Sequence, residues 1–167
     1  TAVLFVIFNR PETTAEVFES IRKARPARLY IAADGPRAGV DSDLTLTVRA
    51  REIAMDIDWP CEISTLFRDK NLGCRNAVSQ AISWFFEHEE QGIVIEDDCL
   101  PHPDFFNFCE TLLDYYKNDT RIGAICGDAA LCDMSGEIQS SYYFSRFFLC
   151  WGWASWRRSW QLFDNEL

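Results

Sequence analysis

The sequence has no stretch approaching the roughly 20 apolar residues that a membrane-spanning helix requires. Its first residues also lack the basic segment and apolar core of a secretory signal peptide. Positive charge is scarce, since 16 Lys and Arg residues face 26 Asp and Glu residues, for a formal net charge of −10. A protein that binds the nucleic-acid backbone needs clustered Lys and Arg to displace counterions. We therefore expect a soluble protein with no membrane-spanning segment and no nucleic-acid partner.

Paired cysteines and metal-binding histidines are also missing. The seven cysteines are an odd number and include no CxxC pair, in a chain large enough to need no disulfides. The two histidines, His88 and His102, lack the spacing of zinc ligands. This usage predicts a reduced, cytoplasmic setting and disfavours a structural zinc site.

The pattern along the chain alternates between strands and helices. The 167 residues, 48% of them hydrophobic, suffice for the core of one ordinary domain. Apolar or alternating runs predict strands at residues 3–8, 29–33, 62–67, 93–95 and 122–126. Apolar residues at three- and four-residue steps predict helices at residues 12–24, 41–58, 75–87 and 104–116. This order predicts an α/β fold with a doubly wound, mostly parallel sheet, in a single domain over residues 1–167.

Some details of the helices are also predicted. Thr13 or Thr14 can cap the first helix, and Asp104 can cap the last. The threonines within residues 41–58 suit a strand as well as a helix. If that segment is a helix, the residues expected to face the core are Leu44, Val48 and Ile53.

Three consecutive acids, Glu96-Asp97-Asp98, follow an apolar strand and precede a loop that contains Pro101. Adjacent carboxylates repel one another, and a cation relieves this repulsion most simply. Hard divalent cations prefer carboxylate oxygens. The run therefore predicts a metal site, whereas the alternative is a solvated acidic turn.

Polar residues follow two further strands, Asn9-Arg10 after the first and Asp34-Gly35 after the second. Because the carboxyl ends of parallel strands meet at one sheet edge, we expect these residues to lie near the acids. A metal ion and Arg10 would oppose phosphate charge, and Asp34 would accept a hydrogen bond from a base or ribose. This combination suits a nucleoside diphosphate. In the alternative interpretation, Arg10 is an ion-pair partner and Asp34 forms a turn.

Residues 140–160 are dense in aromatic side chains. They can form a lid on the core or a platform on which an acceptor sugar stacks. Gly152 would permit close approach between Trp151 and Trp153, which makes these three residues the candidates for the acceptor side.

An ordered series of motifs runs along nearly the whole chain, from Val3 to about Phe163. After the first strand come Asn9-Arg10-Pro11, Ala33-Asp34-Gly35, Asn71-Leu72-Gly73-Cys74-Arg75-Asn76-Ala77, Glu96-Asp97-Asp98, Pro103-Asp104-Phe105-Phe106 and Trp151-Gly152-Trp153-Ala154-Ser155-Trp156. The series resembles the donor-binding half of a GT-A fold glycosyltransferase. It is similar to the N-acetylglucosaminyltransferase I group and to bacterial family-two sugar transferases of the hemolytic-protein-like type.

The resemblance implies a GT-A type sheet and a metal-dependent transfer of a sugar with inversion. It also implies a cytoplasmic location, peripheral to the inner membrane. Residues 1–139 would bind the donor, with a UDP-sugar as the expected molecule. Residues 140–167 would form an acceptor-side segment, cut short at its C-terminus, for a glycan or lipid-linked acceptor. Asp98, the last acid of a variant DxD motif, would bind Mn²⁺ or Mg²⁺. The residues implied in nucleotide-sugar binding are Asn9, Arg10, Asp34, Arg75, Glu96 and Asp97.

An inverting transferase also needs a base that takes the proton of the acceptor hydroxyl. The candidates are Asp164 and Glu166 near the end of the chain, and Asp128 after the last predicted strand. Two rival functions stay open: a sugar-phosphate nucleotidyltransferase, and a module that binds a nucleotide sugar or glycan without turnover. The nucleotidyltransferase normally has a glycine-rich loop after its first strand, which is missing here. A phosphotransfer enzyme would place a nucleophilic Asp where this chain has Asn9.

Overall fold

The computed structural model describes residues 1–128 and 140–164. Its strands are β1 (Ala2–Ile7), β2 (Arg28–Ala33), β3 (Glu62–Phe67), β4 (Gln91–Glu96), β5 (Ala124–Cys126) and β6 (Trp153–Trp156). Its helices are α1 (Pro11–Ala24), α2 (Asp41–Ala54), α3 (Cys74–His88), α4 (Phe105–Tyr116) and α5 (Arg157–Trp160).

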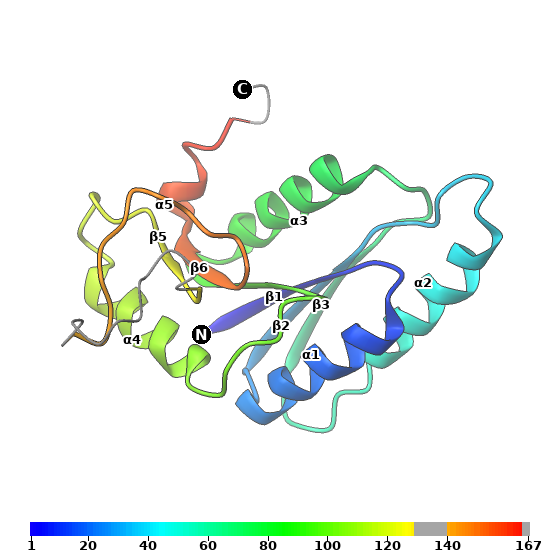
Figure 1. Ribbon diagram of the computed structural model, residues 1–167, viewed down its shortest axis with the longest axis horizontal. Coiled ribbons are helices and arrows are strands. Elements are labelled where there is room, and N and C mark those ends of the chain that lie inside the picture. Colours follow the sequence, from blue (N-terminus) through cyan, green and yellow to red (C-terminus); the bar gives the residue numbers. More distant parts are fainter. Residues whose placement is uncertain (129–139, 165–167) are drawn as a thin grey trace, which may run out of the picture.

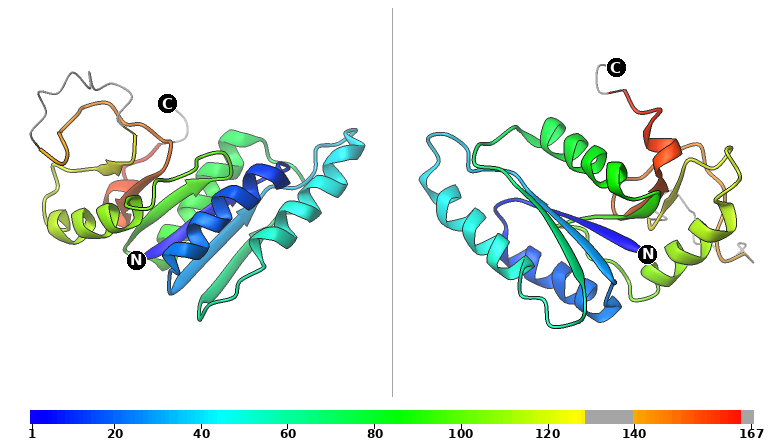
Figure 2. Two further views of the ribbon diagram at one scale, coloured as in Figure 1. Left: turned by 60° about the horizontal axis from the view of Figure 1, so that its bottom comes forward. Right: turned by 180° about the vertical axis from the view of Figure 1, so that it is seen from behind.

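The strands form one sheet in the order β3-β2-β1-β4-β6-β5 (Figure 1). Strands β1 to β4 pair in parallel, and β6 runs antiparallel to both β4 and β5. Helices cover both faces, with α1, α2 and α4 on one side and α3 on the other (Figure 2). The predicted α/β class and doubly wound, mostly parallel sheet are confirmed. Within the described part of the chain, no helix combines the length and apolar character needed to cross a bilayer.

Strand β1 lies in the middle of the core, with helices packed on both faces of the sheet. Alternate residues of a strand point to opposite faces, and both faces of β1 are buried. Phe5 and its same-face neighbours pack in one cluster with α1, α2 and α4. Leu4 packs in a second cluster with Phe85 and Phe86 of α3. A strand covered on both faces is apolar throughout, and this continuous apolar run is why β1 could be predicted from the sequence.

The inner face of α2 differs from the prediction. Leu44 and Val48 are 60% and 53% exposed, whereas Asp43, Thr47 and Ala50 are buried. The helix packs closely through small side chains, and Asp43 is buried because polar partners from two loops surround it. The apolar residues were therefore assigned to the wrong face, although the helix itself and the partly buried Ile53 were predicted correctly.

Of the two predicted helix caps, the one at α1 is wrong, and the one at α4 is right in position. Arg10 occupies the N-cap position of α1, with Pro11 as the first helical residue. The hydroxyls of Thr13 and Thr14 donate back to the Arg10 carbonyl instead of capping. Asp104 does stand at the N-cap of α4, but its side chain makes no capping hydrogen bond.

A polar cluster closes the amino edge of the sheet, opposite the predicted site. Glu89 is buried and accepts hydrogen bonds from Arg28 at 2.9 Å and from the Tyr30 hydroxyl at 3.0 Å. Burial, together with this bond to a carboxylate, raises the pKa of Tyr30 to about 12. The cluster fastens α3 to the start of β2.

Candidate active site

The strand order reverses between β1 and β4. Strands β2 and β3 extend the sheet to one side of β1, and β4 lies on the other. In open α/β sheets, ligands bind in the crevice outside the carboxyl ends of the strands at such a switch point. Asn9 and Arg10 follow β1 at this place, and the three acids end β4.

The three acids stand in a tight turn that separates their side chains. The Cys99 N–H donates to the Glu96 carbonyl at 3.1 Å, which closes the turn. Glu96 is half-buried, Asp97 is 1% exposed, and the Asp98 side chain is 45% exposed. Contiguous acids in the sequence therefore occupy three different environments.

Arg10 bridges two of these acids across the switch point. Its Nη2 lies 2.7 Å from Asp97 Oδ1, and its Nη1 lies 2.6 Å from Asp98 Oδ2. The other oxygen of Asp97 accepts the Phe8 N–H at 2.9 Å. In this structure a guanidinium thus supplies part of the positive charge that the acidic run demands.

Burial shapes the acidity of the two inner acids. It raises the pKa of Glu96, and repulsion from Asp98 and Asp97 raises it further. Burial also raises the pKa of Asp97, against the opposing effects of the Phe8 N–H and Arg10. The site therefore holds negative charge at an energetic cost, which a cationic ligand would relieve.

Asp34 ties the end of β2 to the loop before α3. It is 7% exposed and accepts the Leu72 N–H on both oxygens, at 3.0 and 3.1 Å, as well as the Gly35 N–H. The Asn71 amide donates to the Gly35 carbonyl at 2.9 Å. A Cβ on Gly35 would lie 2.5 Å from backbone atoms of Lys70, so only glycine allows this close approach.

Arg51 of α2 links the residues that follow β2 and β3. Its Nη2 donates to the Asp34 carbonyl at 3.0 Å and to the Arg68 carbonyl at 2.6 Å. Its guanidinium lies over the Phe67 ring, 5.1 Å from the centroid. Burial lowers the pKa of Arg51. The residue fixes the carboxyl ends of β2 and β3 relative to each other.

Asn9 belongs to a second polar cluster that the sequence did not reveal. Its amide donates to Asp43 Oδ1 at 2.8 Å, and Arg37 donates to the same carboxylate through its backbone N–H and guanidinium. These bonds hold the pKa of the fully buried Asp43 well below its usual range. Arg37 also lies over the Phe8 ring, 5.6 Å from its centroid. Asp43 is one of two acids in the first turn of α2, where acids are common, so the sequence did not mark it as buried.

Arg75 stands in the first turn of α3 and is exposed. The helix begins after Gly73, whose φ of 78° lies in the region that favours glycine. Because α3 follows β3, its amino end points to the same sheet edge as the acids. A helix amino terminus carries partial positive charge, which matches an anionic ligand.

The aromatic segment divides between core and cavity. Trp153 is 6% exposed and packs against Phe148 and Trp160. Trp151 is 59% exposed, and the intervening Gly152 has a φ of 76°. Trp153 is therefore part of the core, as the lid interpretation expects, whereas Trp151 is exposed to solvent.

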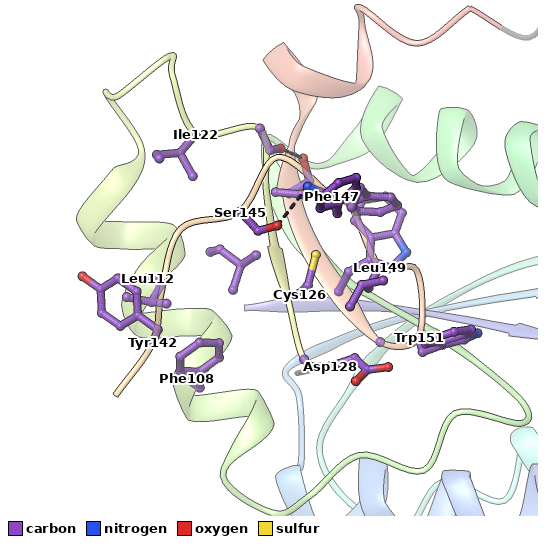
Figure 3. Close-up of a pocket in the computed structure, with 18 of the residues that line it drawn as sticks. Phe108, Leu112, Ile122, Cys126, Asp128, Tyr142, Ser145, Phe147, Leu149 and Trp151 are labelled. Atoms are coloured by element: carbon purple, nitrogen blue, oxygen red, sulfur yellow. Dashed lines mark hydrogen bonds between the residues drawn. The ribbon is translucent and has the colours of Figure 1, made fainter. Parts of the chain in front are cut away.

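A cavity of about 1440 Å³, which Asp98 helps to line, lies between α4, β5 and residues 140–149 (Figure 3). Its walls carry many aromatic and apolar side chains, and Asp98, Asp128 and Trp151 also line it. The Gly127 N–H donates to the Gly152 carbonyl at 2.8 Å, which places Asp128 and Trp151 in neighbouring segments. Two carboxylates and one exposed ring therefore line the same cavity.

The other two candidate bases stand differently. Asp164 is exposed after α5 and does not line the cavity. Glu166 lies outside the described residues. Of the two candidates that the structure describes, Asp128 lines the cavity together with Asp98, and Asp164 does not.

The donor atoms fit a metal ion that is shared with a ligand. In residues 1–128 and 140–164, no three His, Cys, Asp or Glu side chains form a group that could hold a metal ion alone. Mg²⁺ in phosphate-handling sites is usually held by one or two carboxylates together with substrate phosphates. Asp98 offers such an exposed carboxylate, with Arg10 as the cation now beside it.

In comparisons with known proteins, the chain matches solved structures only. No protein-family model matches the chain, and no curated protein matches it. Among solved structures, it is similar to the mannosyltransferase PcManGT from Pyrobaculum calidifontis in complex with GDP-Man and Mn²⁺, at 17% identity and a TM-score of 0.49. The match covers 74% of this chain but only 34% of that one. A likeness of this size assigns neither activity nor ligand to the chain.

Proposed function

We propose that the chain is the donor-binding part of a metal-dependent glycosyltransferase of GT-A type, which transfers a sugar from a nucleoside diphosphate to a hydroxyl acceptor with inversion. The proposal rests on Asn9-Arg10 and the three acids, which follow the neighbouring strands β1 and β4 at the switch point, and on Asp34, which follows β2 at the same edge of the sheet. The order of motifs in the sequence supports it independently.

In this proposal the acids have separate tasks. Asp98 is the protein ligand of a Mn²⁺ or Mg²⁺ ion, because it is the exposed member of the three. Such an ion, when bound, supplies positive charge that stabilises the diphosphate leaving group. Asp97 orients Arg10, and the half-buried Glu96 contacts the ribose or the donor sugar.

The other strand ends bind the nucleotide. Asp34 and the loop that it holds bind the base of the nucleotide, which we propose to be uracil. Arg75 and the amino end of α3 face the phosphates. Asn9 is held at the same edge of the sheet by its bond to Asp43.

The cavity beside Asp98 is the place for the acceptor, a glycan or a lipid-linked sugar. Trp151 offers a flat, exposed ring on which a sugar face can stack. Asp128 is the proposed base that takes the acceptor proton, because it lines this cavity and Asp164, the other candidate within the described residues, does not. Trp153 supports the wall from within the sheet.

Titration calorimetry with UDP-sugars and GDP-sugars, with and without Mn²⁺, tests the proposal. We expect metal-dependent binding that is lost in Asp98→Asn and kept in Asp114→Asn, an exposed acid paired with Lys117 on α4. Asp34→Ala should weaken nucleotide binding even without metal. A donor-hydrolysis assay then separates an enzyme from a module, because metal-dependent binding without turnover favours the module. Absence of any nucleotide binding would reject both.

A further inference from the structure

We propose that Arg10 is a movable cation that occupies Asp98 in the ligand-free protein and transfers to the diphosphate when metal and nucleotide bind. This inference rests on the proposed function and deepens it. Its consequence is measurable, because metal and nucleotide should then each raise the affinity of the other.

The two ion pairs of Arg10 are unequal in their surroundings. Its partner Asp97 is almost completely buried and is also fixed by the Phe8 N–H. Its partner Asp98 is 45% exposed, and the Arg10 side chain itself is 48% exposed. Exposed ion pairs contribute little, whereas breaking a pair with a buried charge is costly. Arg10 should therefore release Asp98 readily and keep Asp97.

The backbone of Arg10 is held by hydrogen bonds that do not depend on its side chain. The Arg10 carbonyl accepts the Thr14 N–H at 2.9 Å and the Thr14 hydroxyl at 2.7 Å. Pro11 then begins α1. The guanidinium can accordingly turn about its contact with Asp97 without any movement of the strand or the helix. Nη1, which now contacts Asp98, becomes available to a phosphate oxygen.

This geometry makes Arg10 a competitor of the metal at one carboxylate. A divalent cation that binds without nucleotide has to displace the guanidinium from Asp98. It then remains close to the positive charge of Arg10, which repels it. A diphosphate changes the balance, because it gives Nη1 a new anionic partner and bridges to the metal. Coupling between two ligands is reciprocal, so the nucleotide must strengthen metal binding by the same factor as the metal strengthens nucleotide binding.

The test measures Mn²⁺ binding by electron paramagnetic resonance, with and without UDP or GDP. Arg10→Met removes the charge and keeps much of the stem. We expect it to bind Mn²⁺ alone about three- to tenfold more tightly than the wild type, and the nucleotide should then raise that affinity by a smaller factor. Arg49→Met removes one charge from an exposed pair with Glu52 on α2 and should leave both values unchanged.

Arg10→Lys serves as a second variant, should Arg10→Met fail to fold by circular dichroism. Lysine keeps the charge but cannot span both carboxylates, so it should free Asp98 in part and bind Mn²⁺ more tightly than the wild type. Unaltered Mn²⁺ affinity in the folded variants, or an undiminished nucleotide effect, would overturn the role of Arg10 alone. Wild-type protein that binds no Mn²⁺ even with nucleotide would overturn the proposed function together with it.

Discussion

Asp97 and Asp98 are adjacent in sequence, yet their removal should affect stability very differently. Asp97→Ala takes away the acceptor of the Phe8 N–H and the buried partner of Arg10. Loss of these contacts should destabilise the fold by about 2 to 4 kcal/mol. Asp98→Ala removes one half-exposed ion pair, which is worth about 0 to 1 kcal/mol.

Thermal unfolding followed by circular dichroism measures this contrast directly. For a chain of 167 residues, we expect Tm to fall by roughly 6 to 12 °C in Asp97→Ala and by less than about 4 °C in Asp98→Ala. Asp97→Asn should recover part of the loss, because its side-chain oxygen can still accept the Phe8 N–H. Equal losses in the two alanine variants, or a larger loss in Asp98→Ala, would refute the division of the acids into an anchor and a ligand.

Four further substitutions test other parts of the structure. The pKa of Tyr30 is about 12 in the folded state and roughly 10 in the unfolded chain. The protonated hydroxyl therefore contributes fully to stability below pH 10, and this contribution is lost as the pH rises to 12. The midpoint of urea unfolding should fall over that range in the wild type and fall less steeply in Tyr30→Phe. Gly35→Ala forces a Cβ against the backbone of Lys70 and should cost about 1 to 3 kcal/mol in urea unfolding, with weaker nucleotide binding. Trp151→Ala should leave stability within about 0.5 kcal/mol, whereas Trp153→Ala should cost about 3 to 5 kcal/mol; similar losses would contradict their division between cavity and core.

Much of the fold could be predicted from hydrophobic pattern alone. The strand at residues 62–67 was located with its true bounds, and the others of the parallel sheet within one or two residues of their true ends. Buried parallel strands are uniformly apolar, so they are conspicuous in a sequence. The α2 helix was different, because it packs through Thr47 and Ala50 while Leu44 faces solvent. Hydrophobicity alone cannot identify such a face.

The place of the site was predictable, but its internal contacts were not. Polar residues at strand ends are visible in a sequence, and parallel topology brings those ends together. The pairing of Arg10 with Asp98 joins residues 88 positions apart, and that of Asn9 with Asp43 joins residues 34 apart. Such contacts depend on the path of the loops and on which charged side chains become buried. Neither can be inferred from a local sequence pattern.

Crystals grown with Mn²⁺ and a nucleoside diphosphate sugar test the central claim most directly. Anomalous scattering at the manganese edge should give one peak within coordination distance of an Asp98 carboxylate oxygen, bridged to both phosphates, with Arg10 Nη1 turned from Asp98 to a phosphate oxygen. A nucleotide bound elsewhere, or a manganese peak away from the end of β4, would contradict the assignment of this sheet edge as the donor site.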